Sequence, residues 1–243
     1  MWRVGLVSLL LLAGCAGIGA HDDMTIVSPT RADLYSVATI QKITDKNAPV
    51  HVYIEGDGHS FNNYGHATDD PTPRSHFVRD LAAADNAPNV AYIARPCQFV
   101  MDEKCKTRDW TTGRFSKSMV DSVASAIKTI AGSRPVILIG YSGGAMISGL
   151  VIQNHAEIDV KKWITIAGVL NHTEWTQYFN DTPLTHSLNL YTLPQVAQTH
   201  YIAEKDTIVP NILSKQWVQE SDIKVIKNAT HDTIPIMKLD FTN

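Results

Sequence analysis

The stretch VILIGYSGGA, residues 136–145, decides the fold of this chain. Its first four residues are aliphatic, as is typical of a strand buried on both faces of a parallel sheet. Gly-Tyr-Ser-Gly-Gly follows, and then an apolar helical pattern from residue 145 to 154. Serine in a G-x-S-x-G turn between strand and helix is a nucleophile elbow, whose small neighbours allow a sharp, strained backbone. The pattern predicts that Ser142 is a nucleophile at the carboxyl edge of a sheet.

Strand and helix patterns alternate on both sides of this stretch. Predicted helices cover residues 76–85, 116–130 and 212–220. In the second of them the apolar residues Met119, Val123, Ile127 and Ile130 recur at the spacing of one helix face. Further β-rich runs lie at residues 50–54, 89–94, 162–167, 200–203 and 223–226, with one or two more strands within 32–43. The alternation predicts an α/β fold with a mostly parallel central sheet and helices on both faces. Residues 170–197 are expected to form a small cap.

A serine hydroxyl is a weak nucleophile and needs a base, which an acid must orient. With a nucleophile elbow, the triad residues follow the chain order Ser, acid, His. Asp206 comes just after the predicted strand 200–203, and His231 lies in the loop after the last strand. Glu204 is the rival acid, but it belongs to the end of the strand. The sequence therefore predicts Ser142, Asp206 and His231 as catalytic residues.

An oxyanion hole needs two backbone N–H groups that point at the developing negative charge. Gly143, the residue after the nucleophile, is one predicted donor. The loop after the strand 50–54 reads Glu55-Gly56-Asp57-Gly58 and supplies the other, with Asp57 as first choice and Gly58 as second. Glu55 is expected to have a structural hydrogen-bonding role.

Composition limits the other functions. The 243 residues fit one domain, and the net charge of −3 comes with no basic stripe, which argues against nucleic-acid binding. His59, His66 and His76 are irregularly spaced, so no metal site is predicted, and no cofactor is implied either.

The N-terminus has the pattern of an export signal. A positive start is followed by an apolar run that is too short to span a bilayer, and then by Leu-Ala-Gly-Cys at residues 12–15. This tetrapeptide resembles the lipobox of bacterial lipoproteins. The resemblance implies a lipoprotein signal peptide over residues 1–14, lipidation of Cys15, a tether over 15–30 and the catalytic domain over 31–243. It places the protein in the bacterial cell envelope, and Ala16, in place of Asp, favours the periplasmic face of the outer membrane.

Two cysteines remain once Cys15 carries lipid. Cys97 and Cys105 are expected to form a disulfide, because an oxidising compartment permits it. Two cysteines without a further Cys or His pair would make a poor zinc site.

The whole mature chain resembles the α/β-hydrolase superfamily, and more narrowly a group of bacterial lipoprotein serine hydrolases. The segments that carry the resemblance are residues 53–58, 94–98, Trp110 with 114–116, and 140–144. The resemblance implies the α/β-hydrolase fold and an esterase-like activity.

The expected function is cleavage of an ester or related acyl bond of a small molecule through an acyl-enzyme. Two alternatives stay open: an amide hydrolase or acyltransferase with the same triad, and a non-catalytic binding protein on the same fold. Arg95 is expected either to bind an acidic substrate group or to form a structural salt bridge. Trp110, Trp175 and Tyr178 are candidates either for the wall of an acyl pocket or for the core.

Overall fold

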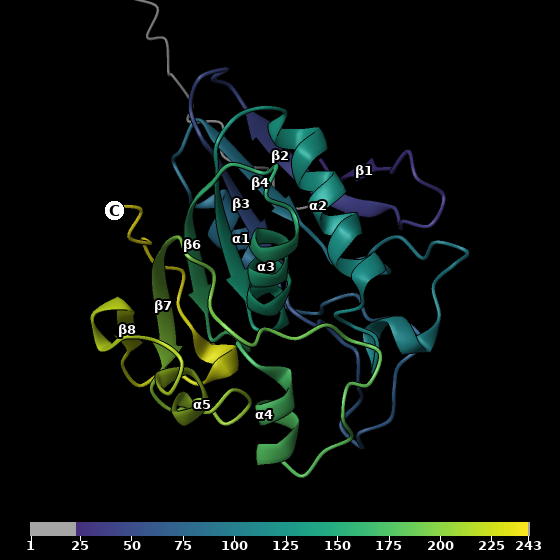
Figure 1. Cartoon of the computed structure of the whole chain (residues 1–243), viewed down its shortest axis with the longest axis vertical. Helices are drawn as coiled ribbons and strands as arrows, with labels where there is room; N and C mark the ends of the chain where they lie inside the picture. Colours follow the sequence, from purple (N-terminus) through teal and green to yellow (C-terminus); the bar gives the residue numbers. More distant parts are fainter. Residues whose placement is uncertain (1–22, 243) are drawn as a thin grey trace, which may run out of the picture.

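A sheet of eight strands runs through the centre of the computed structural model, which describes residues 23–242 (Figure 1). The strand order is β1-β2-β4-β3-β5-β6-β7-β8. The strands are β1 (Thr25–Val27), β2 (Val37–Ile43), β3 (Val50–Ile54), β4 (Asn89–Ile93), β5 (Val136–Tyr141), β6 (Val160–Ile166), β7 (Ala197–Ala203) and β8 (Ile223–Ile226).

The sheet is mostly parallel, as predicted. Only the pairs β1–β2 and β2–β4 are antiparallel, whereas β4, β3, β5, β6, β7 and β8 run side by side in one direction. Ile54 of β3 pairs in register with Ile93 of β4 and with Gly140 of β5. The carboxyl ends of these strands therefore meet at one edge of the sheet, where ligands bind in open α/β sheets.

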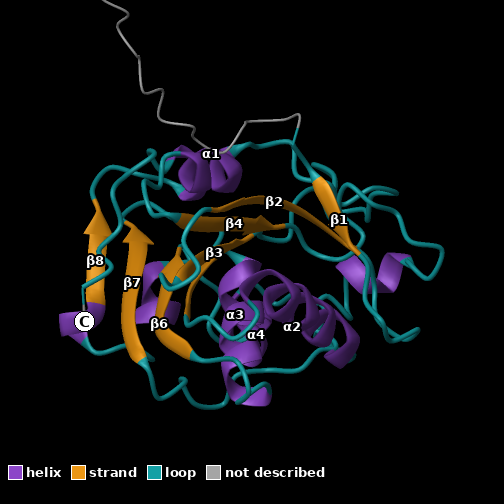
Figure 2. Ribbon diagram, turned by 90° about the horizontal axis from the view of Figure 1, so that it is seen from above, coloured by secondary structure: helices purple, strands orange, loops and turns teal. Residues whose placement is uncertain are grey.

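Helices cover both faces of the sheet (Figure 2). Side chains of α2 (Lys117–Ala131) and α3 (Gly143–Asn154) pack on one face in the larger core cluster. Side chains of α1 (Phe77–Ala83) and of the C-terminal residues Ile234 and Leu239 pack on the other. The helix α4 (His172–Tyr178) follows β6, α5 (Asn211–Lys215) follows β7, and 3-10 turns lie at Thr107–Trp110, Glu220–Asp222 and His231–Thr233.

The predicted apolar face of α2 is buried. Met119, Val123, Ile127 and Ile130 are each at most 5% exposed. Removing such side chains from water contributes roughly 1.5–3 kcal/mol each. The periodicity in the sequence thus decides which side of this helix meets the sheet.

Three elements differ from the sequence prediction. The strand β1 lies inside the segment predicted as a tether, because the β-branched run Thr25–Val27 pairs with β2 and Thr25 Oγ1 lies 3.0 Å from Thr39 Oγ1. The helix α4 interrupts the predicted cap, where the Asn171 side chain caps it by accepting from two backbone N–H groups. The helix expected over 212–220 is only Asn211–Lys215, followed by a 3-10 turn.

The predicted disulfide between Cys97 and Cys105 is present. The two cysteines are 8 residues apart in the sequence. Closing so short a loop stabilises a fold by about 2.5 kcal/mol in the chain-entropy account. The bond fixes the loop after β4, which carries Arg95.

The two edges of the sheet are short strands. The strand β1 has three residues and β8 has four, and Lys224 lies exposed in the middle of β8. Within residues 23–242 no helix is long and apolar enough to cross a membrane. The predicted signal peptide and the lipidation site Cys15 lie outside the described residues.

Candidate active site

Ser142 lies at the sharp turn between the end of β5 and Gly143, the first residue of α3. Its backbone has φ 52° and ψ −121°, a combination that non-glycine residues rarely adopt. A Cβ at Gly140 would lie 2.4 Å from the carbonyl oxygen of Gly144, and a Cβ at Gly144 would lie 2.4 Å from that of Ile54. The turn therefore requires glycine at both positions, and the strand and helix on either side hold Ser142 in its strained conformation.

A chain of hydrogen bonds joins the three residues predicted as catalytic. His231 Nε2 lies 3.1 Å from Ser142 Oγ, and His231 Nδ1 lies 2.8 Å from Asp206 Oδ2. The other carboxylate oxygen of Asp206 accepts from the backbone N–H groups of Ile208 and Val209. A carboxylate beside Nδ1 holds the proton on that nitrogen and leaves Nε2 free to accept from the serine hydroxyl.

The loop after β8 fixes the position of His231. This residue begins a 3-10 turn that Thr230 and Thr233 cap reciprocally. The hydroxyl of Tyr141, the residue before Ser142, donates to the carbonyl oxygen of His231 at a distance of 3.1 Å. The rings of Tyr141 and His231 lie 5.2 Å apart. His231 is thus held by the caps of its own turn and by Tyr141.

Glu204, the rival acid, is turned away from His231. Its carboxylate accepts from Lys227 Nζ and from the backbone N–H of Asn228, both at 2.8 Å. The hydrogen bond from Lys227 holds the pKa of Glu204 below its ordinary value. The structure therefore brings Asp206 to His231, and leaves Glu204 in an ion pair with Lys227.

The predicted oxyanion donors lie together beside Ser142. Among the described residues, no acceptor is hydrogen-bonded to the backbone N–H of Gly143 or of Asp57. A Cβ at Gly143 would lie 2.1 Å from Asp57 Oδ1, so the two residues are in direct contact. Gly58 has a φ of +64°, and a Cβ there would lie 2.2 Å from the carbonyl oxygen of Pro71. Asp57 thus lies against Gly143, whereas Gly58 lies against Pro71.

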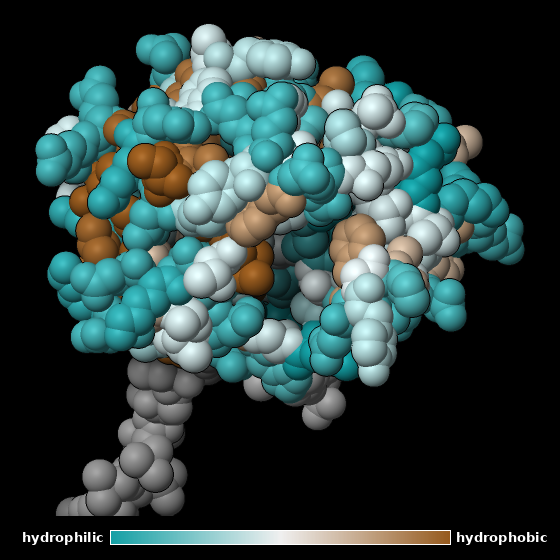
Figure 3. Space-filling view, turned by 90° about the horizontal axis from the view of Figure 1, so that it is seen from below, coloured by the Kyte–Doolittle hydropathy of each residue, from teal (hydrophilic) through white to brown (hydrophobic). Residues whose placement is uncertain are grey.

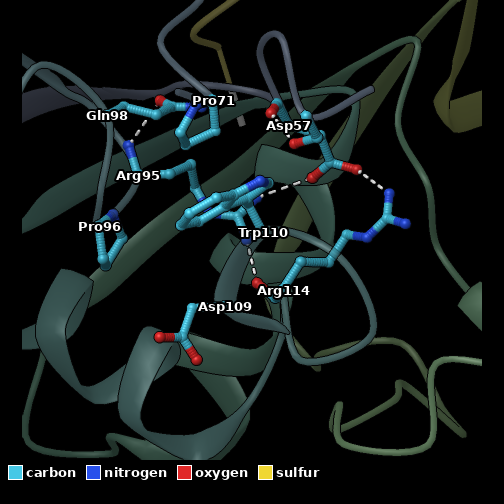
Figure 4. Close-up of a pocket in the computed structure, with 9 residues that line it drawn as sticks. Asp57, Pro71, Arg95, Pro96, Gln98, Asp109, Trp110 and Arg114 are labelled. Carbon is cyan, nitrogen blue, oxygen red and sulfur yellow. Dashed lines mark hydrogen bonds and ion pairs between the residues drawn. The ribbon is translucent and has the colours of Figure 1, made fainter. Parts of the chain in front are cut away.

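Two arginines hold the carboxylate of Asp57 (Figure 4). Arg95 Nη1 lies 3.1 Å from Asp57 Oδ1, and Arg114 Nη1 lies 2.7 Å from Asp57 Oδ2. Burial alone would raise the pKa of Asp57, but the charges of Arg114 and Arg95 hold it below its ordinary value. Asp57 is therefore ionised at neutral pH and fixed in place.

Arg95 has the structural role among the two alternatives. It is 5% exposed, and its second terminal nitrogen donates to the backbone carbonyl of Arg114. Burial lowers the pKa of its guanidinium, an effect that Asp57 opposes. Trp110 packs beside it, donates to the carbonyl oxygen of Thr68, and leaves a space of only about 10 Å³. Arg95 is thus enclosed, with no room for a substrate group.

A cleft of about 580 Å³ opens beside Ser142 and His231. It lies at the carboxyl edge of the sheet, the face that Figure 3 shows hollowed near its centre. Of the three aromatic candidates for a pocket wall, Trp175 lines this cleft. Trp110 lines the small space beside Arg95 and Arg114 instead. Tyr178 is 56% exposed and does not line the cleft.

Glu55 begins the loop that carries Asp57, and its carboxyl group is buried. One oxygen accepts from the N–H of Gly56 and the other from the hydroxyl of Tyr92, each at a distance of 3.0 Å. Burial raises the pKa of Glu55 to about 7, against these hydrogen bonds, which lower it. The structural hydrogen-bonding role expected for Glu55 agrees with these contacts.

We predict that Glu55→Gln removes a pH dependence of stability. The folded chain favours the protonated form of Glu55. Its contribution to the free energy of unfolding is therefore fully present below pH 4.5 and is lost as pH rises through about 7. The whole shift corresponds to about 3 kcal/mol. Urea unfolding at pH 5 and pH 8 should show the variant gaining stability relative to wild type at pH 8. Glu204→Gln, at a half-buried carboxylate, is the control, and an equal response of both variants would contradict the argument.

The three histidines considered for metal binding do not form a site. Within residues 23–242, no group of three or more His, Cys, Asp or Glu side chains could hold a metal ion. His59 lines the cleft, whereas His66 lies exposed, seven residues further along the same loop.

Sequence reasoning missed the role of Arg114 and of the Asp57 carboxylate. Arg114 lies 57 residues from Asp57 in the chain, so no local pattern links them. The available signal was the presence of both arginines in the segments that resemble bacterial lipoprotein hydrolases.

No family model matches the sequence, and no curated protein sequence matches it either. Solved structures do match. An α/β serine hydrolase homologue from Coxiella burnetii has a TM-score of 0.55 and 14% identity, and the match covers 89% of this chain and 92% of that one. An esterase from Pyrococcus furiosus has a TM-score of 0.57 and 12% identity, with 86% and 83% covered.

A third similar structure, from Xanthomonas campestris, is described as an α/β serine hydrolase without a lid. It has a TM-score of 0.50 and 12% identity, and the match covers 87% of each chain. At such identities the likeness concerns the fold. Together with the strand order and the elbow after β5, these neighbours show that the chain has the α/β-hydrolase fold.

Proposed function

We propose that this protein is a serine hydrolase that cleaves carboxylic esters through an acyl-enzyme. The observation that carries the proposal is the hydrogen-bonded chain Asp206–His231–Ser142 beside an open cleft. A serine hydroxyl is activated for attack on an acyl carbon when it is hydrogen-bonded to an imidazole that a buried carboxylate orients. The likeness to a serine hydrolase and an esterase at the level of fold supports it further.

In the first half-reaction, Ser142 Oγ forms a bond to the carbonyl carbon while His231 Nε2 takes the hydroxyl proton. Asp206, which accepts from Nδ1, stabilises the imidazolium that results. The carbonyl oxygen becomes negative and accepts from the N–H groups of Gly143 and Asp57. The intermediate collapses, the bond to the alcohol oxygen breaks, and the alcohol leaves with the proton from Nε2.

In the second half-reaction, water attacks the acyl carbon and His231 Nε2 takes one of its protons. The same two N–H groups hold the negative oxygen. The bond to Ser142 Oγ then breaks, the serine regains its proton from Nε2, and the carboxylic acid leaves. The cycle consumes one water for each ester.

A fluorophosphonate probe tests this function. The probe should label the folded protein covalently at Ser142, and peptide mapping by mass spectrometry identifies the site. A panel of nitrophenyl esters, anilides and ester–amine mixtures then separates ester hydrolysis from amide hydrolysis and acyl transfer. Folded protein that resists the probe while a control esterase reacts would overturn the catalytic proposal and leave a binding protein on this fold.

We also propose that acyl chains on Cys15 anchor the protein at the cell envelope, on the periplasmic face of the outer membrane. One chain holds a protein to a membrane only marginally, whereas two or more hold it stably. The lipobox-like residues 12–15 support this proposal.

The test is expression of wild type and Cys15→Ala in cells fed a labelled fatty acid. Wild type should take up the label and sediment with the outer-membrane fraction. The variant should lose the label and remain as uncleaved precursor or appear in the soluble fraction. Cys97→Ser, which also removes one cysteine, is the control and should keep the label. Unlabelled wild-type protein that is free in the periplasm would contradict the anchor and leave the hydrolase proposal untouched.

A further inference from the structure

Arg114 lies on the wall of the cleft and is held there rigidly. Its Nε donates to the carbonyl oxygen of Thr111 over 2.8 Å, and its Nη1 lies 2.7 Å from Asp57 Oδ2. The guanidinium lies over the rings of Phe61 and Trp175, at 5.4 Å and 5.8 Å from their centroids. Arginine stacks on aromatic faces and then presents its edge in a fixed direction. The side chain is therefore pre-organised without a substrate.

One end of this guanidinium is unused. Arginine carries five N–H donors, and the hydrogen bonds of Arg114 among the described residues involve only Nε and Nη1. The Nε of Arg95 is buried without a partner, but the Nη2 of Arg114 is not such an atom, so solvent reaches it. Arg114 lines the cleft together with Ser142 and His231. Its free donors are therefore open to a molecule in the cleft.

The charges around this donor favour an anion. Asp57 is one carboxylate shared by two guanidinium groups, Arg95 and Arg114, which leaves one positive charge uncompensated. The pKa of Glu55, raised to about 7 by burial, means that this carboxyl adds only a partial negative charge near neutral pH. The other titratable side chains that line the cleft are His59, Arg74, Tyr141, His231 and Asp232, and burial raises the pKa of Tyr141 so that it is neutral. Arg74 and Asp232 are both exposed and have no ion pair among residues 23–242, so their opposite charges offset each other and the positive charge at Arg114 remains.

Arg114 is connected to the turn that carries Ser142 through Asp57. Asp57 contacts Gly143 directly, and Arg114 is the next group beyond the Asp57 carboxylate. An anionic group held by Arg114 would thus lie a few bonds from an ester carbonyl positioned at Ser142.

We propose that Arg114 determines specificity by binding a carboxylate of the substrate, so that the preferred substrates are esters carrying a carboxylate near the scissile bond. This inference rests on the proposed function and adds the substrate class to it. The planar fork of a guanidinium matches a carboxylate, and a hydrogen bond between charged partners is stronger than one between neutral groups. Because the arginine is already ordered, little of that interaction is lost to fixing its side chain.

The experiment compares 4-nitrophenyl hemiglutarate with 4-nitrophenyl valerate, which have acyl chains of equal length and differ in the terminal carboxylate. Wild type should show a kcat/KM at least about tenfold higher for the hemiglutarate at low ionic strength. The preference should shrink as salt is added, because salt screens the attraction. A second pair, the acetates of 4-hydroxybenzoate and 4-hydroxybenzamide, places the carboxylate on the alcohol side.

Arg114→Gln should abolish the preference for the acidic ester, chiefly by raising its KM. Arg114→Lys keeps the charge and should retain part of it. Arg108→Gln is the matched control, since it removes the same charge from the same loop, at a side chain 60% exposed and outside the cleft. It should leave the ratio of the two esters unchanged.

An acidic preference that depends on Arg114 in either pair supports the proposal. Wild type that hydrolyses neither acidic ester faster than its neutral partner overturns it, even if the Arg114 variants fail to fold. Protein that a fluorophosphonate labels but that shows no such preference refutes the role of Arg114 and leaves the hydrolase function standing. Protein that the probe does not label refutes the proposed function itself.

Discussion

Ser142→Ala should lower kcat for a good ester substrate by about five orders of magnitude. Without Oγ there is no atom to form the acyl-enzyme, and only binding and the backbone donors remain. His231→Gln should cost about as much, because the hydroxyl then loses the base that lies 3.1 Å away. The double variant should be no worse than either single one, since the residues act as a unit.

The measurement is the turnover of the purified variants. Contaminating esterases are inactivated beforehand with the fluorophosphonate probe. Circular dichroism and thermal unfolding show whether the variants keep the fold. Ser142→Ala that retained more than about one hundredth of wild-type turnover would rule out the serine as the nucleophile.

Asp206→Asn should lower kcat by about four orders of magnitude, the cost of the same change in a serine protease triad. An amide at this position can donate to Nδ1, which then has to accept, and the proton moves to Nε2. The base is thereby blocked on the side facing Ser142. The carbonyl oxygen of the new amide can still accept from the backbone at Ile208 and Val209, so the loop should keep its shape.

Glu204→Gln is the matched control for this variant. It neutralises a carboxylate two residues away, which pairs with Lys227 instead of His231. Its turnover should stay near wild type. The opposite result, an active Asp206→Asn and an inactive Glu204→Gln, would transfer the role of the acid to Glu204.

The sequence predicted the parts of this molecule that depend on local chemistry. The aliphatic run of β5 and its glycine turn fix the elbow, because a Cβ at Gly140 or Gly144 would lie only 2.4 Å from a backbone oxygen. The positions of Asp206 and His231 follow from strand order, since successive parallel strands bring their carboxyl ends to one edge.

Features that depend on distant contacts could not be predicted. The helix α4 has a short polar sequence and relies on its cap at Asn171, which a periodicity does not reveal. The strand β1 is too brief to stand out from a polar segment, and only its pairing with β2 makes it a strand. The cluster of Asp57, Arg95 and Arg114 joins three loops, so its geometry depends on the finished fold.

The short edges of the sheet bear on self-association. An open sheet offers unpaired backbone donors and acceptors along its outer strands, and a second copy can add a strand there. Here one edge ends after the three residues of β1, and Lys224 marks the middle of the other, β8. Bringing two copies of β8 together would place like charges close to each other, and β1 offers too few ladder positions to offset the loss of motional freedom. Edge-to-edge growth of the sheet into dimers or fibres is therefore disfavoured, even where many copies are crowded on one surface.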